Sequence, residues 1–122
     1  MKFLTLIFLS LSLGLSAQQK MSTATPEQGL IRLMEGNKRY MSGKMLHPDR
    51  SQERRDATAA LQQPFAIILS CADSRVSPEI VFDQGIGDLF IVRDAGNVLG
   101  PVELDSIEFA ALYLKASFIL VM

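Results

Sequence analysis

Three short apolar runs, separated by segments with helical features, place the strongest constraint on the fold. They cover residues 65–69, 89–92 and 118–122, and a continuous apolar run of this length is typical of a strand buried on both faces. A short helix is predicted over 77–82, and a longer one from about residue 101 to residue 115. Strands that alternate with helices pair in parallel through right-handed crossovers. The sequence therefore predicts an α/β fold with a central parallel β-sheet flanked by helices.

The N-terminal half of the chain predicts two further helices. Thr25 has the form of an N-cap, with Pro26 at the first helical position and Gln28 placed to reach back to the cap. Gly43 is expected to end this helix, and a second helix is predicted over 51–62. The apolar stripe expected to pack the first helix consists of Leu30, Leu33, Met34 and Met41, and the stripe on the helix at 101–115 consists of Leu104, Ile107, Ala111 and Leu114.

The two ends of the chain have different characters. Residues 1–17 combine Lys2, an apolar stretch and small residues before a polar segment, which is typical of a secretory signal peptide. The alternative is an uncleaved anchor, but the apolar stretch is shorter than the roughly 18 residues of a spanning helix. We expect a polar linker at 18–24, a domain at 25–122, and a periplasmic or secreted protein without a stable membrane span after cleavage. Because domain termini are usually polar, the apolar end at 118–122 predicts a fold that is incomplete at the C-terminus.

The balance of charged residues and the cysteine count exclude some classes of protein. The chain has 12 Lys and Arg against 13 Asp and Glu, which argues against nucleic-acid binding through bulk electrostatics. It has one cysteine and one histidine, so it forms no intrachain disulfide and no Cys/His zinc cage of its own.

Chemistry-bearing residues follow the first predicted strand. Cys71 comes directly after it, with Asp73 and Arg75 at alternate positions. A thiolate can bind a soft metal or act as a nucleophile, and Arg75 is placed to form a charge-assisted pair with Asp73. The loop from Cys71 to Arg75 is too short to wrap an oxyanion, which argues against a thiolate phosphatase. A buried structural cysteine followed by a surface turn remains an alternative on spacing alone.

Several short motifs in order resemble the β-class carbonic anhydrases. They are Glu35-Gly36-Asn37-Lys38-Arg39-Tyr40, Cys71-Ala72-Asp73-Ser74-Arg75, Pro78-Glu79, Gly87-Asp88-Leu89-Phe90, Arg93, Ala95-Gly96-Asn97 and Ser106-Ile107-Glu108-Phe109-Ala110. The resemblance implies reversible hydration of carbon dioxide to bicarbonate and a proton by a zinc enzyme. It implies that Cys71 is a zinc ligand and that Asp73 is either a further ligand or, held by Arg75, the acceptor that orients the zinc-bound water.

The resemblance also shows what this chain lacks. The family takes its remaining protein ligands from a Gly-His-x-x-Cys element after the next strand, and here that strand is the run at 118–122. His47 lies between two predicted helices and is expected to be a loop residue. We therefore expect the chain alone to be inactive and its parent to form a homodimer or a higher homo-oligomer through the first helix. The alternatives are a zinc hydrolase acting on a carbon dioxide analogue and a non-catalytic protein for assembly or anion binding.

Overall fold

The computed structural model describes residues 24–122, and it confirms the predicted α/β fold. The predicted signal peptide at 1–17 and nearly all of the linker at 18–24 lie outside the described residues. The elements in chain order are α1 (Pro26–Met41), α2 (Gln52–Thr58), β1 (Ala66–Cys71), α3 (Pro78–Val81), β2 (Leu89–Asp94), α4 (Pro101–Leu112) and β3 (Ile119–Val121). Within residues 24–122, no helix combines the length and the apolar character that crossing a bilayer requires.

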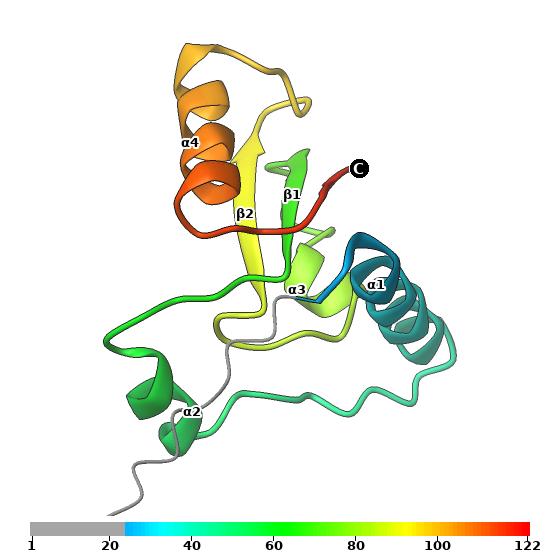
Figure 1. Cartoon of the computed structure of the whole chain (residues 1–122). Coiled ribbons are helices and arrows are strands. Elements are labelled where there is room, and N and C mark those ends of the chain that lie inside the picture. Colours follow the sequence, from blue (N-terminus) through cyan, green and yellow to red (C-terminus); the bar gives the residue numbers. More distant parts are fainter. Residues whose placement is uncertain (1–23) are drawn as a thin grey trace, which may run out of the picture.

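The three strands form one parallel sheet in the order β2-β1-β3, with helices on both faces (Figure 1). One face packs against α4 through a cluster of Ile67, Leu69, Val92, Ile107 and Ala110. The other face packs against α1 through a cluster of Leu33, Phe65, Ala66 and Ile68. The central strand β1 is therefore buried on both sides, as its continuous apolar run predicts.

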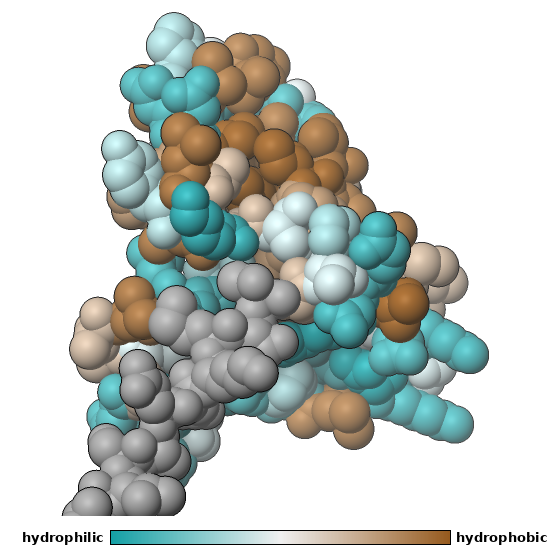
Figure 2. Space-filling model, viewed as in Figure 1, coloured by the Kyte–Doolittle hydropathy of each residue, from teal (hydrophilic) through white to brown (hydrophobic). Residues whose placement is uncertain are grey.

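The two outer strands are less buried than we predicted. In β2 only Val92 is buried, and in β3 Ile119 and Val121 are 48% and 60% exposed. Both side chains are in register with Ile67 and Leu69 of β1, so they lie on the face that α4 packs against. Since α4 contacts β2 and β1, it leaves this part of β3 uncovered. Figure 2 shows apolar side chains gathered at the surface around α4 and β3.

Helix α1 begins as predicted, but its buried side differs from the predicted stripe. Thr25 and Gln28 form the reciprocal capping box. Of the four stripe residues only Leu33 is buried, because the glycines at positions 29 and 36 form the rest of the contact surface. The side chains left exposed are those of Leu30, Met34 and Met41, at 44%, 64% and 78%.

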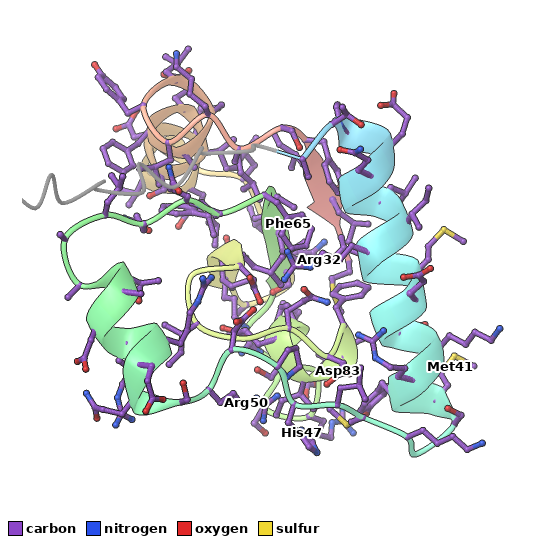
Figure 3. All side chains as sticks on the ribbon, turned by 60° about the horizontal axis from the view of Figure 1, so that its bottom comes forward. Arg32, Met41, His47, Arg50, Phe65 and Asp83 are labelled. Carbon is purple, nitrogen blue, oxygen red and sulfur yellow. The ribbon has the colours of Figure 1, made fainter. Side chains whose placement is uncertain are left out.

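Arginine side chains attach α1 and α2 to the turn before β2. Arg32 lies 4.4 Å over the ring of Phe65 and forms an ion pair of 2.8 Å with Asp88 (Figure 3). Arg54 of α2 donates to the carbonyl oxygen of Ile86 at 2.7 Å and pairs with Asp88 at 3.3 Å. Asp88 therefore joins three segments that are distant in the sequence.

Two helices are shorter than predicted. Helix α2 ends at Thr58 rather than at residue 62, and none of its residues is buried. Most of the stability of a helix in a protein comes from packing one face, so a helix with no buried residue gains little from further turns. Helix α4 ends at Leu112 rather than at residue 115, because Lys115 adopts a left-handed backbone conformation with φ of 59°. The predicted stripe on α4 is wrong at Leu104 and Ala111, which are exposed; Ala110 packs beside Ile107 instead.

Candidate metal centre

The candidate site lies where β1 and β2 end side by side. The register pairs Ser70 with Arg93 and Cys71 with Asp94 at the carboxyl edge of the sheet. In open parallel sheets, reactive groups gather at this edge. The loop that follows β1 carries Asp73 and Arg75, and the turn that follows β2 carries Gly96.

The turn after β2 supplies a hydrogen-bond donor to the thiol. The backbone N–H of Gly96 donates to Sγ of Cys71 at 3.4 Å. Gly96 has a φ of 80°, a conformation that glycine adopts without steric penalty. The Gly96 N–H, followed by the backbone N–H of Asp73, lowers the pKa of the Cys71 thiol, so the site favours the thiolate that binds metals.

The Asp73–Arg75 pair that the spacing predicts is present in the structure. Arg75 donates from Nε to Oδ1 at 3.0 Å and from Nη2 to Oδ2 at 2.7 Å, and its backbone N–H donates to Oδ1 at 2.9 Å. These bonds lower the pKa of Asp73, with the Arg75 side chain as the main cause. Both carboxylate oxygens are therefore engaged, and the carboxylate is held ionised at neutral pH.

A further arginine, whose role the sequence alone does not predict, holds the loop from the other side. Arg93 of β2 donates from Nε to the carbonyl oxygen of Cys71 at 3.0 Å and from Nη2 to that of Asp73 at 2.7 Å. Two features of the sequence point to Arg93: it follows a predicted strand parallel to the strand that precedes Cys71, and it is one of the residues that carry the family resemblance.

His47 lies in a loop, as predicted, and takes part in a different cluster. Its backbone N–H donates to Oδ1 of Asp83 at 3.0 Å, on the segment between α1 and α2 (Figure 3). Across residues 24–122, no three His, Cys, Asp or Glu side chains come together as possible metal ligands. The thiolate of Cys71 and the carboxylate of Asp73 are donor types that fit zinc. They are too few for a tetrahedral site, and Arg75 occupies both oxygens of the second donor.

The fold and the site define an α/β protein with a cysteine thiol and an arginine-bound carboxylate at the carboxyl edge of its parallel sheet. A family model described as carbonic anhydrase matches residues 66–122. Carbonic anhydrase 2 of Mycobacterium tuberculosis is 45% identical over 102 residues, covering 84% of this chain and 49% of that protein. The carbonic anhydrase of Mycolicibacterium smegmatis is 43% identical over 102 residues, covering 84% and 50%.

Solved structures agree with the sequence relatives. The structure of the β-carbonic anhydrase CcaA aligns with a TM-score of 0.54 at 27% identity, covering 74% of this chain and 45% of that chain. The chain belongs to the carbonic anhydrase family, in its β class. It spans about half the length of the curated relatives that it matches.

Proposed function

We propose that the protein containing this chain catalyses the zinc-dependent, reversible hydration of carbon dioxide to bicarbonate and a proton. Relatives named carbonic anhydrase at 45% and 43% identity support the reaction. The observation that carries the proposal is the carboxylate of Asp73, clamped by Arg75 two residues after the thiol of Cys71.

Each residue of the site has a distinct role in this proposal. A bound zinc ion supplies a nucleophilic hydroxide from water at neutral pH. Cys71 is one of its ligands, and the Gly96 N–H helps to keep the sulfur ionised. Asp73 accepts a hydrogen bond from the reacting water, and Arg75 fixes the direction of that carboxylate. Aspartate is ionised at neutral pH, and the lowered pKa of Asp73 extends its ability to accept further into the acid range.

Substitutions at Cys71 and Asp73 test these roles. In the whole zinc-loaded protein, Cys71→Ser should lower kcat/KM for carbon dioxide hydration by about 100-fold or more, because an alcohol is a poor zinc ligand. Asp73→Asn should also lower it, since the amide keeps one acceptor oxygen where the carboxylate has two and cannot both pair with Arg75 through two oxygens and accept from the water. Stopped-flow hydration with a pH indicator measures both.

The matched control is Asp105→Asn, which removes an exposed carboxylate on α4 and should leave the rate unchanged. Undiminished activity in Cys71→Ser would contradict the zinc assignment. If the unaltered protein shows no hydration activity, the non-catalytic alternative replaces this proposal.

The 122-residue chain by itself should not bind zinc tightly. It contains one cysteine and one histidine, and His47 is tied by its backbone to Asp83. We therefore propose that it lacks hydration activity on its own. Isothermal titration with zinc should show no tight one-equivalent site, and observation of such a site would be contrary to this expectation.

We propose a homodimer or a higher homo-oligomer in which α1 contributes to the interface. Its exposed apolar side chains, Leu30, Met34 and Met41, are those that burial against another copy would cover. Met34→Glu should shift the protein toward the monomer in light scattering, whereas Glu35→Gln on the same helix should not. An unchanged mass for Met34→Glu would argue against this surface.

We also propose that the protein is exported to the periplasm or the medium. The support is the signal-peptide pattern of residues 1–17. The mature protein should begin at Gln18, which N-terminal sequencing of protein from the native host tests directly.

A further inference from the structure

We propose that Arg93 is a positioning residue that fixes the location of Cys71 and Asp73 by holding the backbone of the loop between them. This role is defined by the geometry of the loop, and the expected effect of Arg93 on catalysis rests on the proposed function. Arg93 touches neither the thiol nor the carboxylate through its hydrogen bonds; all of its acceptors are backbone carbonyl oxygens.

The contacts of Arg93 extend from the end of β1 along the loop to Val76. Its Nε donates to the carbonyl oxygen of Cys71 at 3.0 Å, and its Nη2 donates to that of Asp73 at 2.7 Å and to that of Val76 at 3.5 Å. A guanidinium presents its donors in a rigid plane, so two nitrogens bound to two carbonyl groups define the distance between those groups. Arg93 therefore holds the chain on both sides of Ala72.

Arg93 forms no ion pair in the part of the chain that the structure describes, although its charge also helps to lower the pKa of Cys71 and of Asp73. Arg32, Arg39, Arg54 and Arg75 all form ion pairs with aspartates, whereas Arg93 forms none within residues 24–122. A half-buried cation directed at carbonyl oxygens alone strengthens those hydrogen bonds, because bonds to charged donors are stronger than neutral ones. This arrangement differs from the ion pairs that join the helices to the turns.

The loop that Arg93 holds lies beside the turn after β2, whose Gly96 N–H donates to Sγ of Cys71. Arg93 is the residue before Asp94, whose carbonyl oxygen accepts from the N–H of Ala72 at 2.6 Å. Asp94 also accepts, through Oδ1, from the N–H of Val98 at 2.7 Å, which closes the turn containing Gly96. A shift of the Cys71 backbone would therefore change the contact between Sγ and the Gly96 N–H, a group that Arg93 does not touch.

Arg93→Met tests the proposal because methionine keeps much of the aliphatic length and removes every donor. In the 122-residue chain, the amide resonance of Gly96 should shift, together with those of residues 72–76, while the resonances of the β1 core at 67 and 68 stay in place. A role confined to stability would lower the free energy of unfolding and leave Gly96 unmoved in the folded protein. Arg55→Met is the control, because Arg55 is exposed on α2.

Arg93→Lys keeps the charge but not the planar fork, so it keeps the proposal testable if the methionine variant does not fold. Its Gly96 resonance should shift in the same direction by a smaller amount. An unaltered Gly96 resonance in Arg93→Lys, or in folded Arg93→Met, overturns the proposal.

Activity gives an independent second readout. In the whole protein, Arg93→Met should reduce kcat for carbon dioxide hydration by about 10- to 100-fold, as loss of an outer-shell contact does in metal sites, and Arg93→Lys should restore part of it. If the unaltered protein is inactive, the proposed function fails while the resonance test of Arg93 still stands. If the unaltered protein is active and Arg93→Met retains full kcat, the positioning role fails alone.

Discussion

Gly36→Ala should lower the free energy of unfolding by about 3 kcal/mol or more, as expected where a new methyl group meets rigid backbone. A Cβ at this position would overlap the carbonyl oxygen of Phe82 and lie 2.7 Å from its carbonyl carbon. Nearby, Asn37 donates from Nδ2 to the carbonyl oxygen of Val81 at 3.1 Å, so α1 cannot move away without breaking that bond. Since alanine favours helices more than glycine does, the loss would come from packing alone.

Urea unfolding followed by circular dichroism measures this loss. The control is Glu35→Ala, which shortens an exposed side chain on the same helix to a methyl group and should change stability by less than about 0.5 kcal/mol. A Gly36→Ala chain as stable as the control would show that α1 and α3 tolerate a wider separation than the structure has.

Asp83→Ala should be destabilising by about 3 to 5 kcal/mol, the range for removing one partner of a buried ion pair. The Asp83 side chain is fully buried and accepts from Arg39 Nε at 2.6 Å and from the backbone N–H groups of Leu46 and His47 at 2.9 and 3.0 Å. All three donors would lose their acceptor. Among the described residues, Asp83 is the only side chain that accepts hydrogen bonds from Leu46 and His47. The loop after α1 would therefore lose this attachment.

The same carboxylate should make stability depend on pH in the acid range. Burial raises the pKa of Asp83, but the hydrogen bond from Arg39 and those from the two backbone N–H groups lower it more, to about 2. A carboxyl whose pKa is lower in the folded state stabilises the fold above its unfolded pKa, and that stabilisation disappears as the pH falls through the folded value. Its contribution should therefore be complete above about pH 4 and lost toward pH 2.

The measurement compares urea unfolding of the unaltered chain and Asp83→Asn between neutral pH and pH 2. The stability difference between the two should narrow as the pH falls, since protonated aspartic acid and asparagine are both neutral. Asp105→Asn, on the exposed side of α4, should show no such narrowing. A difference in free energy of unfolding that does not change with pH would mean that Asp83 is uncharged in the folded protein.

Local patterns in the sequence predicted the elements and the core of the candidate site. The Thr25–Gln28 capping box and the Asp73–Arg75 pair each involve residues three or two positions apart, so their spacing alone identified them. The apolar run before Cys71 likewise identified the central strand.

Interactions between distant segments could not be predicted in the same way. Asp83 meets Arg39 across 44 residues, and Arg93 meets the carbonyl oxygens of Cys71 and Asp73 across 22 and 20 residues. These partners meet because of how α1 and β2 pack in the fold, and the sequence of one segment does not predict that packing. Strand β3 is exposed because α4 packs against β2 and β1. An apolar run in the sequence does not show which strands a helix will cover.

The location of the candidate site within a single crossover has a consequence for how the site assembles. Cys71, the Asp73–Arg75 pair, Arg93 and Gly96 all belong to one β1-α3-β2 crossover. The contacts that join the two ends of this crossover span 20 to 25 residues, so the chain entropy of closing that loop is lost when β2 pairs with β1. The thiol of Cys71 and its neighbours are thus arranged by the pairing of two strands of the same crossover, so a partner that binds there would meet a group whose orientation is already set. Binding then requires less ordering of the chain, which is the advantage of a preorganised site.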